Sequence, residues 1–268
     1  DGMSHVKNLV RQNLLDVEKI IEWNHLHGIR FYRLSSSMFP HYNNPETPRY
    51  SLDTFQDLFE RIGQKSHHLN HRLTFHPGQF CQLGTPHNKV LESTISELSM
   101  HAEVMDRMGL PDDSVMIVHG GGSYGDKDKT LRRLEKSIQD LPNKIKRRLV
   151  LENDEFQYSP KDLLDLCERC DVPLVLDFHH WAIHTGNQEV GEFLPRIIEL
   201  WEERGIRPKF HISDQKFGAR TGAHADYVED IPKSIFEMDV DLMVEAKHKE
   251  LAVFKLYKKY PSLQCRVK

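Results

Sequence analysis

The sequence is poor in cysteine and contains no long hydrophobic run. Only four of its 268 residues are cysteines, at irregular positions, which argues against a disulfide scaffold and favours an intracellular protein. No stretch of roughly eighteen apolar residues occurs and no signal-peptide core is recognisable, so neither a membrane span nor secretion is expected. An excess of basic residues is lacking too. The net charge of −4 argues against nucleic acid as a partner, unless bound divalent cations reverse the local sign.

Cys167 and Cys170 have the spacing of a zinc or redox motif. No second pair of this spacing accompanies them, and they fall in the last turn of a predicted helix. We therefore expect two half-buried helix residues here rather than a metal site.

The rest of the composition is that of a globular protein. Hydrophobic residues make up 38% of the chain and charged residues 28%. The length is close to the ~250 residues of a single (β/α)8 barrel. No linker or change of composition divides the chain, so we expect one domain over residues 1–268. Histidine is unusually frequent, with 17 copies.

Six short apolar segments are each followed directly by a histidine, an aspartate or a glutamate. The segments span 72–75, 114–118, 149–151, 173–176, 208–210 and 241–244, and the residues after them are His76, His119, Glu152, Asp177, His211 and Glu245. Successive members of this set lie 25 to 43 residues apart, about the length of a strand, a crossover helix and two loops. Helices are predicted over 5–28, 52–70, 88–109, 126–141, 160–170, 188–204, 231–238 and 246–260.

This alternation predicts an α/β fold, specifically a (β/α)8 TIM barrel. A strand over 29–34 brings the number of predicted strands to seven, and the chain starts on a helix. We therefore expect the first strand of a closed barrel to lie upstream of Asp1. Because the carboxyl ends of parallel strands form the active face of such folds, the six residues are expected to converge.

A convergent set of imidazoles and carboxylates suits a cluster of two or three divalent metal ions. Burying such groups at strand ends is costly unless something pairs with them, and the mixture of ligands favours Zn, Mn or Fe(II) over Mg alone. His180 is expected to join the set because it follows Asp177 by three residues. His224 has weaker support, with Asp226 as its alternative. Any one of these residues could instead cap a helix or pair with a neighbour.

Two further polar segments are candidates for contact with a large substrate. Gln79 and Phe80 lie on a turn beside His76, where an amide and an exposed aromatic ring could enter a base stack or simply cover the surface. Lys216 and Arg220 lie in the polar loop 213–229 and could contact a nucleic-acid backbone or be solvated loop charges.

Five strings carry more specific information. They are WNHLHGIRFYRLSSSMFP (23–40), TFHPGQF (74–80), LVLENDE (149–155), LDFHHW (176–181) and DLMVEAKHKE (241–250). Together they resemble the ultraviolet damage endonuclease family, and the resemblance covers essentially the whole chain. It sets the sequence apart from the apurinic endonucleases and sugar isomerases that share the barrel and its metal chemistry.

The resemblance implies a TIM barrel with up to three metal ions, usually manganese, with zinc and magnesium as alternatives. It implies incision of double-stranded DNA immediately 5′ to cyclobutane pyrimidine dimers, 6-4 photoproducts and some abasic sites, leaving 3′-hydroxyl and 5′-phosphate ends. The protein would act with the DNA, in the nucleus or mitochondrion of a eukaryote or the cytoplasm of a bacterium. A monomer is expected, with no membrane partner.

The resemblance also assigns roles to individual residues. The implied metal ligands are His76, His119, Glu152, Asp177, His180, His211, His224 and Glu245. Glu152 would be the central bridging carboxylate, and Lys209 matches a lysine that can be carboxylated in relatives; these two are the expected catalytic residues. Gln79 and Phe80 fall where the family inserts a Gln-Tyr pair at the lesion, so a phenylalanine replaces the usual tyrosine. Asn44 holds the position of a histidine near the metals, with His41 three residues earlier.

Three other activities remain open at this point. An apurinic endonuclease would need no photolesion, and a sugar isomerase would use two metals on the same barrel. A DNA-binding protein without catalytic activity is the third. The turn at Gln79 and Phe80 argues against the isomerase, because a small sugar needs no such probe. The completeness of the candidate ligand set argues against the inactive protein.

Overall fold

The computed structural model describes residues 2–186 and 189–265; positions 1, 187–188 and 266–268 lie outside these ranges. Its strands are β1 (Phe31–Leu34), β2 (Arg72–Phe75), β3 (Met116–His119), β4 (Leu149–Glu152), β5 (Leu174–Val175), β6 (Lys209–Ile212) and β7 (Asp241–Val244). Its α-helices are α1 (Gly2–Leu26), α2 (Gln56–His68), α3 (Asn88–Arg107), α4 (Lys127–Gln139), α5 (Asn143–Lys146), α6 (Pro160–Cys170), α7 (Phe178–Ile183), α8 (Val190–Glu203) and α9 (Lys249–Lys259). Four 3-10 helices complete the described elements: η1 (Ser36–Met38), η2 (Leu52–Phe55), η3 (Lys233–Glu237) and η4 (Pro261–Leu263).

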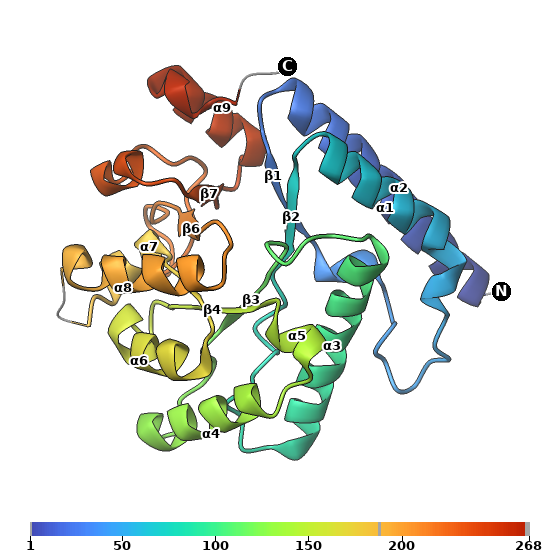
Figure 1. The fold of residues 1–268 in the computed structure, drawn as a ribbon, viewed down its shortest axis with the longest axis horizontal. Coiled ribbons are helices and arrows are strands. Elements are labelled where there is room, and N and C mark those ends of the chain that lie inside the picture. The colour runs from blue at the N-terminus through green and yellow to red at the C-terminus, as the bar shows by residue number, and fades with distance from the viewer. Residues whose placement is uncertain (1, 187–188, 266–268) are drawn as a thin grey trace.

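The strands pair in parallel and in chain order. β1 to β5 form one sheet, and β6 pairs with β7. A parallel bridge between Asp177 and His211 connects the two sheets, and the backbone amide of His211 donates to the carbonyl of Leu176 over 2.9 Å. The helices lie outside this curved array of strands (Figure 1). The predicted alternation of parallel strands and outer helices is therefore confirmed.

β1 and β7 stand at the two ends of the array. Within residues 2–186 and 189–265 no backbone ladder joins them, and every residue of β7 is partly exposed. Two arginines, Arg33 of β1 and Arg72 of β2, connect this side of the array to β7 and the residue after it. At the amino ends of the strands Arg72 contacts Asp241 over 2.8 Å, and at the carboxyl ends Arg33 pairs with Glu245. Residues of both strands line one open cleft of about 1730 Å³. The expectation of a strand upstream of Asp1 stays a prediction.

The boundaries of α6 follow from local capping chemistry. Ser159 accepts a hydrogen bond from the backbone amide of Asp162, and the carboxylate of Asp162 accepts one from the amide of Ser159. Pro160 occupies the first helical position, where its missing amide proton is not needed. Asp171 ends the helix in the left-handed conformation. This helix matches its predicted bounds residue for residue.

Other helices differ from prediction in type or extent. The predicted helix 52–70 starts as the 3-10 helix η2 before α2 begins, and the segment 231–238 forms only η3. In η3 only Ile235 is buried, so the segment has too small an apolar face to stabilise a longer α-helix. α5 and α7 were not predicted. Gln188, the first residue of the predicted helix 188–204, lies outside the described residues.

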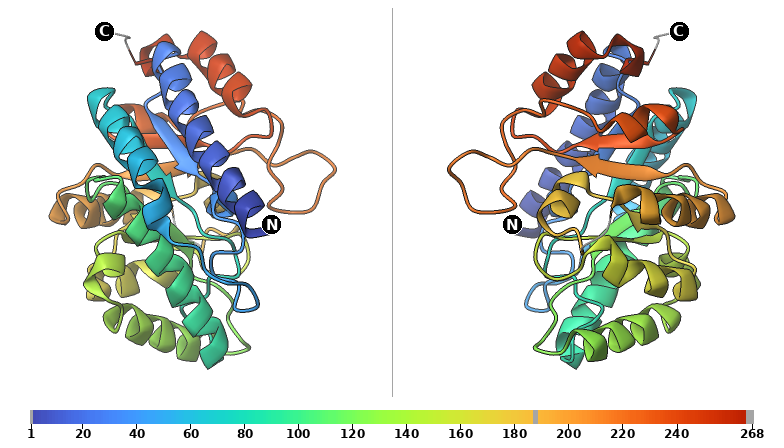
Figure 2. Two further views of the ribbon diagram at one scale, coloured as in Figure 1. Left: turned by 90° about the vertical axis from the view of Figure 1, so that its right-hand side faces the viewer. Right: turned by 90° about the vertical axis from the view of Figure 1, so that its left-hand side faces the viewer.

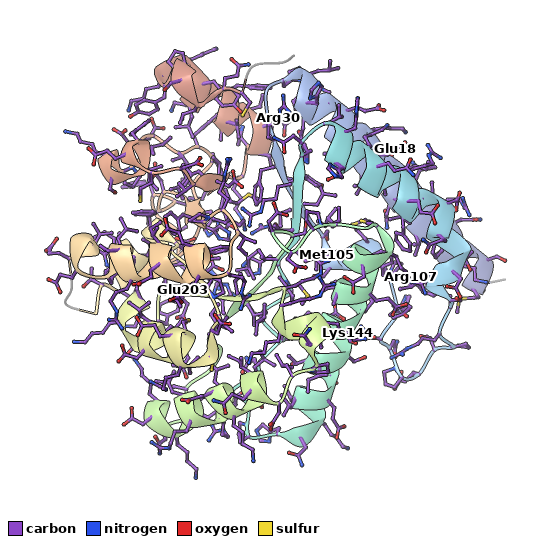
Figure 3. The ribbon with its side chains drawn as sticks, in the orientation of Figure 1. Glu18, Arg30, Met105, Arg107, Lys144 and Glu203 are labelled. Carbon is purple, nitrogen blue, oxygen red and sulfur yellow. The ribbon has the colours of Figure 1, made fainter. Side chains whose placement is uncertain are left out.

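Side chains fill the space between strands and helices (Figure 3). Met105 lies on the inner side of α3 and is fully buried, whereas Arg107 lies on the outer side and pairs with Glu103. Cys167 and Cys170 are free thiols at 0% and 2% exposure, so they are more deeply buried than the half-buried state expected. Among the described residues, no helix combines the length and the apolar character that crossing a membrane requires.

Candidate metal centre

The carboxyl ends of the strands carry the residues that the sequence predicted to converge. His76 follows β2, His119 and Glu152 are the last residues of β3 and β4, and Asp177 follows β5. Glu245 follows β7, whereas His211 lies within β6 and not after it, because the ladder with β7 continues to Ile212. Since the strands are parallel, all six residues lie at the same end of the array.

Glu152 is the centre of this group. Its Oε2 atom lies 2.8 Å from Nε2 of His76 and 3.5 Å from Nε2 of His119. Its other oxygen, Oε1, lies 2.5 Å from Nδ1 of His211. The side chain is 1% exposed. A single buried carboxylate therefore faces imidazoles that come from three different strands.

The remaining candidates lie on the side of the group nearest β5, β6 and β7. Nδ1 of His211 lies 3.9 Å from Oδ2 of Asp177 and 3.4 Å from Oε1 of Glu245. Nε2 of His180 lies 3.8 Å from Oδ2 of Asp177. Nδ1 of His224 lies 3.5 Å from Oε2 of Glu245. The structure thus brings His180 and His224 to the same cluster.

Asp177 is held by the short helix that it starts. Its Oδ1 atom accepts hydrogen bonds from the backbone amides of His179 and His180 over 2.8 and 2.9 Å. Asn153 fixes the backbone of Asp177 from both sides, accepting from its amide and donating to its carbonyl. The other carboxylate oxygen, Oδ2, is buried and has no hydrogen-bond partner. A buried carboxylate oxygen without a partner is costly, and a bound cation would satisfy it.

Burial and neighbouring charges separate the pKa values of the acidic residues. Burial raises the pKa of Asp177 to about 7. Burial also opposes ionisation of Glu152, but the facing imidazoles of His211, His119 and His76 outweigh it and hold the pKa of that carboxyl well below its usual range. For Glu245, burial is likewise outweighed, by His211 and by the guanidinium of Arg33, and the pKa falls to about 2.

These residues fit divalent metal ions. The donor atoms of His76, His119 and Glu152 lie within 4.8 Å of one another, and so do those of Glu152, Asp177 and His211. The two triads share Glu152, which can direct one oxygen to each. Nitrogen and carboxylate donors together suit manganese, iron or zinc, and the partnerless Oδ2 atom of Asp177 points to the same conclusion.

Lys209 is buried beside the cluster but outside both triads. Its Nζ atom lies 2.6 Å from Nε2 of His211 and 5.0 Å from the ring centre of Phe31. Burial lowers the pKa of Lys209 to about 7 and that of His211 to about 4. With a cation bound at Nδ1, the ring of His211 would carry its proton on Nε2, where a neutral Lys209 amine can accept a hydrogen bond.

Gln79, Phe80 and Arg220 line the open cleft above the cluster. The ring of Phe80 is 62% exposed and covers the backbone of Gly78, where an added Cβ would lie 2.5 Å from the ring. Arg220 belongs to the loop that follows β6, which projects from the body of the protein in both views of Figure 2 (orange).

Three residues considered from the sequence lie outside the cleft lining. Asn44 is not among the residues that line the cleft, and its side chain accepts a hydrogen bond from the amide of Glu46 in a surface turn. His41 is likewise absent from the cleft lining. Lys216 is not a lining residue either and pairs with Asp226 over 3.1 Å. Because Asp226 pairs with Lys216 while His224 faces Glu245, the structure favours His224 over Asp226 as the residue at the cluster.

Two charged neighbours of the cluster were not predicted from the sequence. Glu155 lies 3.3 Å from Nδ1 of His180, and Arg33 pairs with Glu245. The polar run Glu152-Asn153-Asp154-Glu155 directly after a buried strand was the available signal for Glu155. Arg33 had no comparable signal, because its partner follows a strand at the opposite end of the array.

The comparisons with known proteins agree with this geometry. The sequence matches the family model of UV-endonuclease UvdE over residues 1–267. It is 39% identical to a putative UV-damage endonuclease of Acanthamoeba polyphaga mimivirus, covering 99% of this chain and 84% of the relative. It is 41% identical to the UV-damage endonuclease of Schizosaccharomyces pombe, covering 97% of this chain but only 45% of that longer protein.

The solved structures confirm the fold. The crystal structure of SacUVDE superposes with a TM-score of 0.88 at 30% identity, covering 97% of this chain and 89% of the other. Endonuclease IV from Thermus thermophilus superposes with a TM-score of 0.61 at 15% identity, covering 92% and 93% of the two chains, which shows a shared fold alone. The predicted TIM-barrel fold is confirmed by these neighbours. On the family match and the two sequence relatives, the chain belongs to the UV-endonuclease UvdE family.

Proposed function

We propose that this chain is a metal-dependent DNA repair endonuclease. It cuts double-stranded DNA immediately 5′ to cyclobutane pyrimidine dimers, 6-4 photoproducts and some abasic sites, and leaves 3′-hydroxyl and 5′-phosphate ends. The observation that carries the proposal is the buried Glu152 carboxylate, which is shared by two potential metal triads; His76 and His119 of the first triad line the open cleft. The names of the relatives supply the substrate class, ultraviolet-damaged DNA.

The donor set supports a cluster of two or three ions, with manganese the expected metal. His76, His119 and Glu152 would hold one ion, and Glu152, Asp177, His211 and Glu245 a second. His180 and His224 would hold a third, between Asp177 and Glu245. When bound, such ions lower the pKa of water and neutralise the charge that develops on the phosphate oxygens.

The chain's own residues then have distinct tasks. Glu152, with one oxygen facing each triad, would contribute to both metal sites. Lys209 holds the ring of His211 in the orientation that presents Nδ1 to the cluster. Phe80, exposed beside His76, is placed to enter the stack at a distorted lesion, with Gln79 next to it. Arg220 offers a positive charge to the phosphate backbone along the cleft.

The open cleft favours a polymeric substrate over a small sugar. Phe80 is an exposed aromatic on the rim of a cleft of about 1730 Å³, whereas a site for a small molecule buries most of its ligand's surface. Bound cations would also offset the acidic residues of the cluster, so the overall charge of −4 does not prevent an approach by DNA.

The proposal is tested by incision of a defined duplex with a single cyclobutane dimer, with manganese and with EDTA. An undamaged duplex and an abasic duplex are cut in parallel, and Glu152→Gln is the inactive control. We expect a manganese-dependent cut directly 5′ to the dimer and none in the undamaged duplex. Cutting of the abasic duplex alone would support the apurinic endonuclease instead. Absence of any cut by metal-loaded protein would contradict the proposal.

We further propose that residues 1–268 act as one domain and as a monomer, in the compartment that holds the cell's DNA. The unbroken chain order of the paired strands supports the single domain. Light scattering coupled to gel filtration tests the monomer, for which a mass near 31.4 kDa is expected.

A further inference from the structure

Glu155 lies between the candidate metal centre and the projecting loop. It sits in the connection between β4 and α6, with its side chain 18% exposed. Its Oε2 atom lies 3.3 Å from Nδ1 of His180, which is buried and makes no aligned hydrogen bond in the structure. The other ring nitrogen of His180, Nε2, lies 3.8 Å from Oδ2 of Asp177. The two nitrogens of one imidazole therefore face two different carboxylates, and only Asp177 belongs to a potential metal triad.

The loop that follows β6 packs directly on Glu155 through a glycine. Gly222 has a φ of +81°, and a Cβ added there would lie 2.5 Å from Oε1, 2.8 Å from Cδ and 2.9 Å from Cγ of Glu155. Real Cβ atoms essentially never come so close, so any larger residue would displace the Glu155 side chain or the loop.

This part of the loop is held in place by its own hydrogen bonds. Gln215 accepts from the amide of Gly222 over 2.8 Å and donates to the carbonyl of Arg220 over 2.9 Å. The amide of Lys247, just after β7, donates to the carbonyl of Ala225 over 3.0 Å. The backbone at Gly222 is thus held in place, and its close approach limits the positions open to the Glu155 side chain to those beside His180.

We propose that Glu155 is a positioning residue that fixes the ring of His180 with Nε2 toward the metal centre, and that Gly222 is needed to keep it there. A carboxylate that accepts the Nδ1 proton of a histidine selects the tautomer whose Nε2 lone pair is free to bind a metal ion. The proposal rests on the metal centre of the proposed function, but not on the nucleic acid that the enzyme cuts.

The first experiment measures metal binding and the histidine tautomer in Glu155→Ala and Glu155→Leu, neither of which can accept a hydrogen bond at this position. Affinity for Mn²⁺ is measured by titration with detection of free ion by electron paramagnetic resonance. The tautomer of His180 is read in the metal-free protein by nitrogen-15 NMR. Loss of such a carboxylate typically weakens metal binding by about ten- to a hundredfold. We expect that loss at one site of the cluster, together with a shift of His180 away from the Nδ1-protonated form.

The control variant is Glu203→Ala, which removes an exposed carboxylate from α8 (Figure 3). It should leave both Mn²⁺ affinity and the His180 signals unchanged. If Glu155→Ala fails to fold, Glu155→Leu provides the same test, because it keeps most of the volume of the side chain and cannot accept a hydrogen bond.

The second experiment tests the steric contact between Gly222 and Glu155 with a matched pair of glycine variants. Gly222→Ala and Gly218→Ala impose the same backbone cost, because both residues lie in one loop with φ values of +81° and +70°. Only Gly222 faces Glu155; a Cβ at Gly218 has nothing within 4 Å. We expect Gly222→Ala, but not Gly218→Ala, to weaken Mn²⁺ binding as Glu155→Ala does. In the Glu155→Ala background, Gly222→Ala should add little further loss.

Wild-type Mn²⁺ affinity and an unchanged His180 tautomer in both Glu155 variants would overturn the proposal. Equal effects of the two glycine variants would overturn the role of Gly222. Both readouts are independent of DNA cleavage. If they behave as expected while no damaged duplex is cut, the proposed function fails and the positioning role stands.

Discussion

The raised pKa of Asp177 predicts how Asp177→Asn changes the free energy of unfolding, and the sign of that change depends on whether metal is bound. Its carboxyl is completely buried in the folded protein, and burial raises its pKa from 3.8 to about 7. The folded state therefore binds this proton more tightly than the unfolded state does. The resulting stabilisation is fully present below the unfolded pKa and is lost as the pH rises through the folded pKa. At pH 8 the metal-free protein carries a buried charge that costs about 4 kcal/mol, from roughly three pKa units at about 1.4 kcal/mol each.

Asp177→Asn removes this charge while the amide oxygen can still accept from the amides of His179 and His180. In EDTA the variant should gain up to about 4 kcal/mol relative to wild type at pH 8, and this gain should shrink toward zero near pH 4. With Mn²⁺ present the order should reverse, because metal binding stabilises the wild type and the variant lacks a ligand.

Urea unfolding followed by circular dichroism at pH 5 to 8, in EDTA and in Mn²⁺, measures both effects. The change with pH is the test, since any constant cost of the amide is the same at every pH. A difference between variant and wild type that does not change with pH would refute the reasoning. So would a wild type that is the more stable protein in EDTA at pH 8.

Three other substitutions test separate parts of the account. Glu152→Gln should reduce bound manganese by more than one ion per chain, measured by equilibrium dialysis and elemental analysis; loss of a single ion would contradict the shared carboxylate. Phe80→Ala should weaken binding of a dimer-containing duplex in a fluorescence anisotropy titration without changing metal content, whereas Phe236→Ala, an exposed ring outside the cleft lining, should not. Asp241→Asn leaves the guanidinium of Arg72 buried without its charged partner, so the free energy of unfolding in urea should fall by about 3 kcal/mol, and an unchanged value would show that the pair does not join β2 to β7.

The fold and the centre of the site were predictable because they depend on short-range patterns. A buried strand produces an apolar run, and the residue after it lies at the carboxyl end of the sheet whatever the rest of the chain does. His76, Glu152 and Asp177 could therefore be placed together before any contact was known, and the structure brings them together. Only the exact strand ends differ, as at His211, which the ladder with β7 includes.

Features that depend on a few local hydrogen bonds were harder to predict. α7 has only six residues, which is too short for an apolar period to show in the sequence. It begins because the carboxylate of Asp177 caps its first amides. The side chain of Asn44 could not be placed from the sequence either, and its expected contact with DNA stays a prediction. Its position in the chain matched a site residue, but Pro45 follows it and its side chain bonds within a turn, away from the cleft.

Contacts between distant loops could not be predicted at all. The role proposed for Glu155 depends on Gly222, which packs against it from a different connection of the barrel. Similarly, Lys216 reads as a free positive charge in the sequence, but Asp226 pairs with it in the folded loop. Both contacts depend on the path of the loop after β6, for which glycines and polar residues give no periodic signal.

The central claim is that the Glu152 cluster performs metal-dependent incision beside a photolesion. It is tested most directly by single-turnover cleavage of an end-labelled duplex with one cyclobutane dimer, by wild type and Glu152→Gln at saturating Mn²⁺. We predict that the wild type yields one product ending directly 5′ to the dimer, and that neither the variant nor the wild type in EDTA yields any. Equal cleavage by the variant, or cleavage that persists in EDTA, would contradict the account.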